Sequence, residues 1–569
     1  FKIEQNVNQA IIHTHNANNV SIVNNWIIGI SPAAPRGVDA GYGSANSDGV
    51  VIEGNKFEDL YCGVYINQAT DLSIDANDFV ADMGDGAIVF DGTWNFSNID
   101  VINNTATDAN YLMFYYGSQG SVTYSGNTLN STLLSNWKVF NVNKGNFYQT
   151  IQAAIVAASA ADVIQVAAGT FTETISVNKS LIINGPNIGV DPNGAAPRLD
   201  EAVLLDGKLQ VSGANTIVID GIKVRQTNDF LDALLLGGSS VVTLQNSIIE
   251  RFGVNTGVGA RGLTTAAGPG LKTIQNNLFT GDLSGGLYSG HKTWNSGMYV
   301  NGGSSTLNIL NNVFENCRTA INLDDYNTNI ALSGNTFQNS GTLLSFGGTT
   351  PTDGSYILGV NDFNPIGAFI NLSNVAETFR LDITSSTVIG VPFSSISLAT
   401  LFDIEATMYH RSRSSRKGLV YYVADHVFVR SDINSSIKTA IAYAAAGDIV
   451  NVAPGAYTEA VVLNKAVTLK GANAGVAAGN NPGSRSTETV LDGGFYVTAA
   501  ATIDGFKIIN GSSSGSILNC VTAAVSGITV QNSILQDVAG NQNNGIETIG
   551  GANNLTLTNN TITNNWRGI

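Results

Sequence analysis

Paired carboxylates are the side chains in this chain that could most directly do chemistry. Asp324 and Asp325 are adjacent in INLDDYNT, Arg318 precedes them, and His291 lies in SGHKTW. Two carboxyl groups can serve as acid and base in cleaving a glycosidic bond. The competing interpretation, which we favour, is a polar turn in which the two aspartates cap backbone groups.

A second candidate is the histidine pair His13 and His15 in IIHTHN. Residues two apart on a strand share one face, as metal ligands could. No Cys, Asp or Glu lies next to them in the sequence to act as a third ligand, so we predict an exposed polar pair. We therefore predict no catalytic, cofactor-binding or metal-binding residues, and leave open only calcium in the turns.

A large internal repeat indicates how the elements that position these residues are organised along the chain. The phrase IQAAIVAASAADVIQVAAGTFTETISVNKSLIINGPN begins at residue 151 and returns, in related form, at 437, a shift of 286 residues. Self-similarity at a fixed period indicates a repeat architecture. We expect later coils of one module at 1–145, a complete module at 146–430 and the first part of the next at 431–569. Because both ends fall inside a module, we expect the chain to be a segment of a longer array.

A shorter period runs through most of the chain, in which an alternating apolar strand is followed by an asparagine and another apolar pair. The asparagines Asn25, Asn55, Asn77, Asn104 and Asn127 are spaced by 30, 22, 27 and 23 residues. This is the length of one coil of a parallel β-helix. Asparagine tolerates the left-handed backbone of a corner, and stacked side-chain amides can bond to one another. We therefore predict an all-β, right-handed parallel β-helix with an internal asparagine ladder. Leu307, Ile309, Val313 and Phe314 illustrate the apolar residues expected to alternate in and out and to stack into columns.

One segment in each module is predicted to be a helix. Residues 148–160 and 434–446 are rich in alanine with apolar residues at helical spacing, and Gln149-Thr150 or Ser435-Ser436 could cap them. Such a helix would cover the open end of the first coil. Glu173 and Glu459 recur after it, and we interpret them as partners in a structural hydrogen bond.

The junction at 402–430 differs in character, with Arg411, Arg413, Arg416 and Lys417 in a dense basic cluster before a β-rich stretch. Three interpretations stay open. The cluster is a solvated loop, an electrostatic contact with acidic coils of a neighbouring module or chain, or a binding patch for nucleic acid or an anionic polysaccharide.

Composition narrows the function classes. Only 12% of residues are charged, 62 are glycine and the net charge is −16. A negative chain without broad basic surfaces disfavours nucleic acid as a partner. The three cysteines are far apart and show no disulfide or zinc spacing, and no apolar run is long enough to span a bilayer.

The cap-and-coil phrase resembles the opening of β-helix domains of the pectate-lyase-like superfamily. The resemblance is carried by Asp162, Gly169, Thr172-Glu173, Asn178-Lys179 and Gly185, and again by Asp448, Gly455, Thr458-Glu459, Asn464-Lys465 and Gly471. The array also resembles very large secreted or surface proteins of Bacteroidetes-type bacteria. The resemblance implies a β-helix fold. The best-known proteins with this fold are enzymes that act on acidic polysaccharides, so the resemblance also calls for a search for their catalytic residues. The signature strings of pectin methylesterases do not occur, nor does the acidic cluster of pectate lyases. His291 precedes the aspartates, whereas polygalacturonases have the opposite order.

We therefore predict a non-catalytic structural repeat of an extracellular filament, stalk or adhesin at a bacterial surface. Its expected partners are neighbouring copies, end to end or laterally, and surface glycans. The alternative is a polysaccharide lyase, hydrolase or esterase, or a carbohydrate-binding β-helix.

Overall fold

The computed structural model covers most of the chain. It describes residues 2–569 apart from 6–8, 31–34, 43–44, 81–82, 92–95, 118–119, 121, 131–132, 228–231, 238, 253–259, 267, 283–292, 302–305, 325–328, 347–355, 365–366, 373–374, 376–377, 411–417, 434, 480–482, 511–518 and 538–542. The chain divides into two compact units. Unit 1 is Phe1–Gln226 with Ser240–Ile248, and unit 2 is Thr227–Ser239 with Ile249–Ile569.

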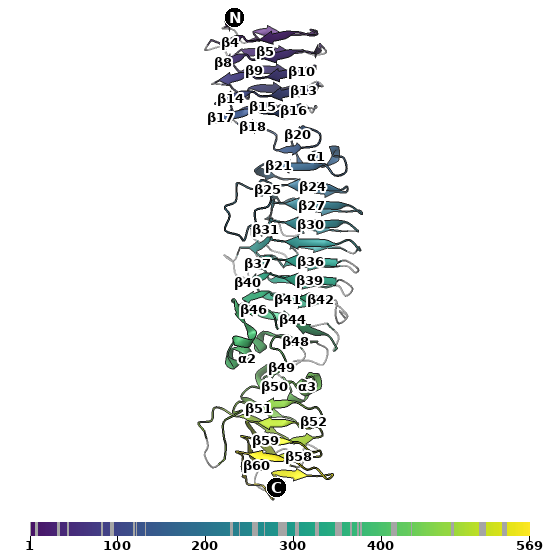
Figure 1. Ribbon diagram of the computed structural model, residues 1–569, viewed down its shortest axis with the longest axis vertical. Coiled ribbons are helices and arrows are strands. Elements are labelled where there is room, and N and C mark those ends of the chain that lie inside the picture. The colour runs from purple at the N-terminus through teal and green to yellow at the C-terminus, as the bar shows by residue number, and fades with distance from the viewer. Residues whose placement is uncertain are drawn as a thin grey trace. The chain divides into compact units, whose positions relative to one another are not determined.

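Each unit is a parallel β-solenoid, in which neighbouring strands of a sheet come from successive coils (Figure 1). The predicted all-β, parallel β-helix fold is thus confirmed. The predicted module boundaries at 145/146 and 430/431 stay a prediction.

The first part of unit 1 has three sheets. In order of pairing, one sheet holds β1 (Lys2–Gln5), β4 (Trp26–Gly29), β8 (Lys56–Glu58), β11 (Asp78–Val80), β14 (Thr105–Thr107) and β17 (Thr128–Asn130). The second holds β16 (Val122–Ser125), β13 (Phe96–Ile102), β10 (Ala69–Asp75), β7 (Val51–Glu53) and β3 (Ser21–Val23), with β6 (Ser47–Asp48) paired to β10. The third holds β18 (Leu133–Ser135), β15 (Tyr111–Tyr115), β12 (Ile88–Phe90), β9 (Cys62–Ile66), β5 (Arg36–Ala40) and β2 (Ile12–His13).

The rest of unit 1 begins the next set of coils. One sheet runs β20 (Asn146–Tyr148), β19 (Val139–Asn141), β21 (Val163–Val166), β24 (Leu181–Asn184), β27 (Thr216–Asp220) and β30 (Val241–Gln245). The other strands are β22 (Gly169–Phe171), β25 (Ala202–Leu205) and β28 (Lys223–Gln226) in one sheet and β23 (Ile175–Val177) and β26 (Leu209–Val211) in another. The pairings of β19 with β20 and β21 are antiparallel.

Unit 2 repeats the three-sheet arrangement. In its first coils, the first sheet holds β33 (Lys272–Gln275), β36 (Thr306–Leu310), β39 (Asn329–Ser333) and β42 (Tyr356–Leu358). The second sheet holds β31 (Ile248–Arg251), β34 (Leu278–Gly281), β37 (Val313–Glu315), β40 (Thr336–Gln338), β43 (Asp362–Asn364), β46 (Thr387–Val388) and β47 (Val391–Pro392). The third sheet holds β29 (Leu234–Leu236), β32 (Arg261–Thr265), β35 (Ser296–Val300), β38 (Thr319–Leu323), β41 (Thr342–Phe346) and β44 (Ala368–Asn371). β45 (Arg380–Asp382) pairs with β48 (Leu419–Tyr421). In its last coils, one sheet holds β49 (His426–Val429), β50 (Ile449–Val452), β53 (Thr468–Lys470), β56 (Thr502–Asp504), β59 (Thr529–Gln531) and β62 (Thr556–Thr558). Another holds β51 (Gly455–Thr458), β54 (Thr489–Asp492), β57 (Phe506–Asn510), β60 (Ile534–Asp537) and β63 (Thr561–Thr563). The last holds β52 (Val461–Leu463), β55 (Phe495–Val497), β58 (Val521–Ala523) and β61 (Ile546–Thr548).

The asparagine ladder is present in both units. In unit 1, Asn25, Asn55, Asn77 and Asn104 each donate from Nδ2 to the Oδ1 of the next ladder residue at 3.1 Å, ending at Asn127. Each also donates its backbone N–H to the same oxygen. Unit 2 repeats this with Asn277, Asn312, Asn335 and Asn361, and the backbone N–H of Asn361 then donates to the hydroxyl of Ser386. The predicted ladder is confirmed.

The left-handed corner residue is not the ladder asparagine. Positive φ occurs at the residue before it, as at Asn24 with φ 57°, Ala76 with φ 53° and Asn103 with φ 54°. We explained the ladder asparagines by the tolerance of asparagine for the left-handed backbone conformation, and this explanation is therefore wrong. The ladder asparagine is needed for its side-chain amide, which bonds from coil to coil.

Aromatic rings stack beside the ladder. The ring centroids of Phe279, Phe314, Phe337 and Phe363 are separated by 4.6, 5.4 and 5.4 Å, with interplanar angles of 9–14°. Leu307 and Ile309 are buried as predicted, whereas Val313 is only half-buried. The interior is thus built from columns, each of which depends on the ring or methyl groups of the coils above and below.

The predicted cap helices are α1 (Ile151–Ala157) and α3 (Ile437–Tyr443), whose N-caps are Thr150 and Ser436. Glu173 accepts from the backbone N–H groups of Ile151 at 2.8 Å and Gln152 at 2.9 Å. Lys179 donates at the other end to the carbonyls of Val156 and Ala158. The carboxylate lies at the positive end of the helix dipole and the ammonium at the negative end, so both charges stabilise the helix.

The second copy has the same clamp. Glu459 accepts from the N–H groups of Ile437 and Lys438 and from the Ser436 hydroxyl. Lys465 donates to the carbonyls of Ala442 and Ala444. The interpretation of the recurring glutamates as structural hydrogen-bond partners is confirmed.

We expect Glu173→Ala to destabilise unit 1 by about 1–2 kcal/mol, because two helix N–H groups lose a charged acceptor. The backbone amides of Ile151 and Gln152 should exchange with deuterium faster than in the parent. The matched control is Glu53→Ala at an exposed glutamate of the same unit, which should leave both rates unchanged. Equal exchange in the two variants would show that Glu173 does not hold the helix.

A third helix corrects the expectation of one helix per module. Helix α2 spans Leu398–Thr407 and is capped by Ser397, so it enters the junction predicted at 402–430. It is held there by buried Glu405, which accepts from the Tyr422 hydroxyl at 3.1 Å and contacts Nε2 of His410 at 2.8 Å. Buried Leu401 and Ile404 on the same helix pack beside this glutamate, so apolar burial and the contacts of Glu405 together stabilise the helix.

The thiols of Cys62, Cys317 and Cys520 are free and buried. Burial is the largest cause that raises their pKa values, to about 12 for Cys520 and further for the other two. Because the thiolate is the reactive species, we expect a disulfide reagent at pH 8 to label none of them in the folded protein and all three in denaturant. Rapid labelling of the folded chain would contradict this burial.

Candidate functional site

An arginine, a tyrosine and an aspartate from three successive coils meet in unit 1. The Arg36 guanidinium carbon on β5 lies 3.3 Å from the ring centroid of Tyr65 on β9. The Tyr65 hydroxyl donates to Oδ2 of Asp91, which follows β12, at 2.7 Å. Asn67 also donates to this carboxylate at 3.4 Å.

Unit 2 contains the same arrangement. Arg261 on β32 lies 3.5 Å from the ring centroid of Tyr299 on β35, and the Tyr299 hydroxyl donates to Asp324 at 2.5 Å. Burial, followed by the hydrogen bond to Asp324, raises the pKa of Tyr299 to about 12. Burial and the hydrogen bond to Asp91 likewise raise the pKa of Tyr65. Both phenols are therefore neutral donors at physiological pH.

Strand register explains why the two sets match. Arg36 is paired with Cys62 and Arg261 with Ser296, while Tyr65 is paired with Asp39 and Tyr299 with Thr264. The two sites thus differ at two of these positions, where unit 1 has Cys62 and Asp39 and unit 2 has Ser296 and Thr264. The site in unit 2 has no counterpart of Asp39.

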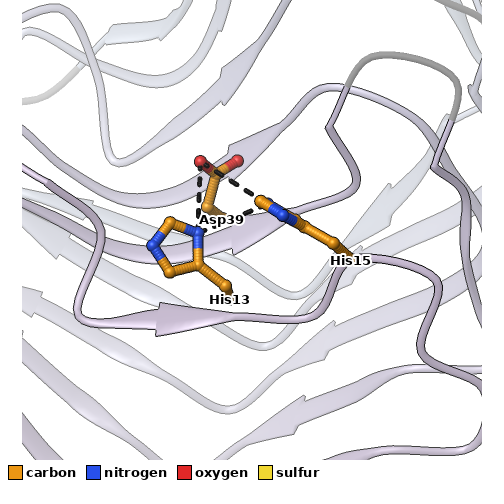
Figure 2. A group of neighbouring side chains, drawn as sticks. All are labelled: His13, His15 and Asp39. Carbon is orange, nitrogen blue, oxygen red and sulfur yellow. Dashed lines mark hydrogen bonds and ion pairs between the residues drawn. The ribbon is translucent and has the colours of Figure 1, made fainter.

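Asp39 also links the two candidate histidines to this site through its contact with Arg36. Figure 2 shows the side chains of His13 and His15 beside that of Asp39. His13 is paired with Asp39 across β2 and β5. Nδ1 of His13 lies 3.3 Å from Nε2 of His15, and these nitrogens lie 3.8 and 4.0 Å from Oδ2 of Asp39. Arg36 approaches the same oxygen at 3.3 Å. We predicted that no acidic residue lies near the histidines. This holds along the sequence, but it is wrong in the folded structure, where Asp39 lies beside both.

Asp39 is only 4% exposed. Burial raises the pKa of its carboxyl, and the charges of Arg36, His15 and His13 oppose that shift. Within the described residues, its Oδ1 is buried and has no hydrogen-bond partner. The site thus contains a desolvated carboxylate beside two imidazoles that are partly open to solvent.

Of the remaining sequence candidates, the structure describes Asp324 and Arg318. Asp324 is the acceptor for Tyr299, and Arg318 lies 3.5 Å from the side-chain oxygen of Asn295. Asp325, His291 and the basic cluster Arg411, Arg413, Arg416 and Lys417 lie outside the described residues. The polar turn that we favour for Asp324 and Asp325, and the alternative of an acid–base pair, therefore stay hypotheses.

A pocket of about 540 Å³ in unit 1 lies near the predicted module boundary. Its lining is largely apolar and includes the aromatic side chains of Tyr124, Trp137, Phe140 and Phe147. Lys138 is the one charged residue in that lining, so the pocket adds no acid–base pair to the candidates above.

None of the helices in the described part of the chain is long and apolar enough to cross a membrane. No model of a known protein family matches the chain, and no curated protein matches it. Among solved structures, a mutant of the PL6-family alginate lyase AlyGC is similar over 100% of this chain and 81% of its own, with 9% identity and a TM-score of 0.17.

This comparison contradicts the prediction that the protein is not an enzyme, because the similar structure is that of a lyase, and we withdraw that prediction. At this identity and TM-score, the likeness assigns no activity to the chain.

Proposed function

We propose that the chain is a structural repeat of an extracellular filament, stalk or adhesin at a bacterial surface. The proposal is carried by what recurs at the start of the two module copies. Six pairs of charged residues recur there, and each makes hydrogen bonds that hold a turn, a helix end, a loop or a coil corner. They are Asp162 and Asp448, Glu173 and Glu459, Lys179 and Lys465, Arg198 and Arg485, Glu201 and Glu488, and Asp220 and Asp504.

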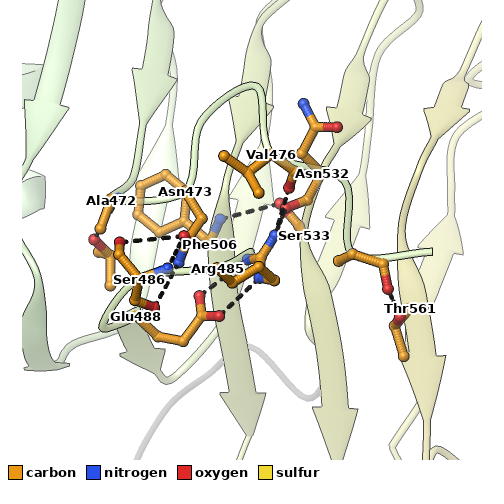
Figure 3. Close-up of polar contacts among 12 residues, drawn as sticks. Ala472, Asn473, Val476, Arg485, Ser486, Glu488, Phe506, Asn532, Ser533 and Thr561 are labelled. Atoms are coloured by element: carbon orange, nitrogen blue, oxygen red, sulfur yellow. Dashed lines mark hydrogen bonds and ion pairs between the residues drawn. The ribbon is translucent and has the colours of Figure 1, made fainter. Parts of the chain in front are cut away.

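The arginine pairs pin a long loop in each copy. Figure 3 shows Arg485 beside Glu488, with bonds of 2.8 and 3.0 Å from Nε and one terminal nitrogen to the two carboxylate oxygens. Its other terminal nitrogen donates to the carbonyls of Val476 at 2.6 Å and Asn532 at 2.9 Å. One guanidinium therefore ties two ends of a loop to a later coil.

The first copy reproduces these contacts. Arg198 bonds to both oxygens of Glu201 and donates to the carbonyls of Val190 and Asn246. Because both residues of each ion pair are mostly buried, the bidentate contact is stronger than an exposed pair.

Aspartates secure the coil corners in the same way. Asp220 accepts from Gly189, Gln245 and Asn246. Asp504 accepts from the equivalent residues Gly475, Gln531 and Asn532. Recurring charge in this part of the chain thus serves cohesion, which favours a mechanical role for the repeat.

The partners that suit this role are neighbouring copies, end to end or laterally, and surface glycans. In a continuous stack each coil adds about 4.8 Å, so a module of about ten coils would repeat every 50 Å or so. Electron microscopy of the native material tests the proposal. Continuous fibres with an axial repeat of one or two modules would support it, and discrete monomers would contradict it.

The Arg–Tyr–Asp sites favour a second candidate function, polysaccharide binding or cleavage. Guanidinium groups pair with carboxylates, and aromatic and carboxylate side chains suit sugar rings and hydroxyls. Arg261, Tyr299 and Asp324 supply all three within one site. The test is binding to, and product release from, alginate, pectin and related polymers. Loss of both in Asp324→Asn, with no change in Asp100→Asn at an exposed position, would support this function, and no binding by the parent would exclude it for the polymers tested.

A further inference from the structure

The cluster of His13, His15 and Asp39 has the composition of a transition-metal site, and its argument is independent of the proposed function. Two imidazoles and one carboxylate offer three ligand atoms that lie within 4.8 Å of one another. Zinc sites with three protein ligands use this kind of donor set and keep a fourth position for water.

The spacing of the donor atoms suits a small four-coordinate ion. Metal–nitrogen bonds of about 2.0–2.1 Å at tetrahedral angles place two ligand nitrogens about 3.3–3.4 Å apart. The nitrogens of His13 and His15 lie 3.3 Å apart. The Asp39 oxygen, at 3.8 and 4.0 Å, needs to approach by about half an ångström, which a rotation of the histidine or aspartate side chains can supply.

Asp39 provides the second, independent observation. Its side chain is about 95% buried, and in the described part of the chain Oδ1 has no hydrogen-bond partner. A buried carboxylate oxygen without a partner is costly. The oxygen that faces the histidines is Oδ2, which Arg36 also contacts. An ion beside the histidines that is bound through both carboxylate oxygens would give Oδ1 a partner and so compensate that cost.

The second Arg–Tyr–Asp site shows that these ligands are not needed to build the coil. Thr264 takes the register position of Asp39, and Leu235 takes that of His13. The arginine and tyrosine are the same in both sites. His13 and Asp39 are therefore an addition to a coil that forms without them.

We propose that His13, His15 and Asp39 bind one divalent first-row transition-metal ion, with Zn²⁺ as the expected occupant. Imidazole suits zinc and its neighbours, whereas calcium takes oxygen ligands. The ion would join β2, a strand of two residues, to β5. His13 and His15 are 45% and 29% exposed, which leaves the fourth position open to water.

Metal titration of the untagged chain, residues 1–569, tests this proposal. After treatment with a chelator, we expect one Zn²⁺ or Co²⁺ per chain at this site, with the visible absorption of tetrahedral Co²⁺. His13→Gln, His15→Gln and Asp39→Asn should each weaken binding on the order of 10- to 100-fold. The control His426→Gln alters a histidine of unit 2 that contacts Asn451 and should bind as the parent does.

A further variant separates ligation from folding. His15→Cys keeps a zinc ligand at the same position and should restore Zn²⁺ binding that His15→Gln loses. Circular dichroism of each variant checks the fold. Binding by the parent no tighter than by a triple His13→Gln, His15→Gln, Asp39→Asn variant would overturn the proposal, as would a Co²⁺ spectrum that the three substitutions leave unchanged.

Discussion

Replacing Asn312 by alanine is expected to destabilise unit 2 by about 3–5 kcal/mol, because several buried polar groups lose their partner together. Oδ1 of Asn312 accepts from the backbone N–H and the side chain of Asn277, both at 3.0 Å. Its Nδ2 donates to Asn335 and to the carbonyls of Ile274 and Leu310. Asn312 is fully buried, so each lost bond carries a desolvation cost.

Urea denaturation measures the loss, and hydrogen exchange at the Asn277 amide locates it. Asn312→Ser should lose less, because Ser386 already performs the acceptor role at the end of the ladder. The control is Asn329→Ala at the exposed start of β39, which we expect to stay within about 0.5 kcal/mol of the parent. Equal losses at Asn312 and Asn329 would mean that the ladder does not stabilise the solenoid.

The ladder was predictable from sequence because its signal is local. Each asparagine stands between an apolar strand and an apolar pair, so the same three features recur close together in each coil that carries a ladder asparagine. The cap helices were predictable for the same reason, since Thr150 and Glu173 stand at fixed distances from an alanine-rich segment that occurs twice. Helix α2 was missed although its Ser397 cap and buried Leu401 and Ile404 are local signals. The contact of Glu405 with Tyr422, a residue on a later segment, has no such signal.

The candidate sites were not predictable because their residues come from different coils, and coil length varies with the loops. Arg36, Tyr65 and Asp91 correspond to Arg261, Tyr299 and Asp324 at shifts of 225, 234 and 233 residues. None of these shifts equals the 286-residue period, so a comparison at that period misses the match. The shared strings RGV and RGL, and GVYIN and GMYVN, are the signal that could have found it.

The glycines in those strings have a steric reason. A Cβ at Gly297 would lie 3.1 Å from the ring of Phe314 and 2.8 Å from the carbonyl oxygen of Ala320. Glycine therefore lets the strand that carries Tyr299 pack closely on the phenylalanine column. The position of the candidate site and the packing of the interior depend on the same residue.

Replacing Phe314 by alanine should destabilise unit 2 by about 3–5 kcal/mol, the usual loss for a buried phenylalanine. Phe314 is fully buried and stacks on Phe279 and Phe337 at centroid distances of 4.6 and 5.4 Å. Its removal creates a cavity and takes the stacking partner from both neighbours, each contact being worth about 0.5–1.5 kcal/mol beyond burial.

Graded substitutions distinguish a packed column from a loosely filled interior. Phe314→Leu keeps much of the volume but not the ring, so it should cost about 1–2 kcal/mol. Phe252→Ala, at a phenylalanine that is 52% exposed, is the matched control and should change the urea midpoint little. If Phe314→Ala lowers the midpoint no further than Phe252→Ala does, the ring column is not what holds the coils of unit 2 together. A loss in Phe314→Leu as large as in Phe314→Ala would instead assign the stability to ring stacking and not to filled volume.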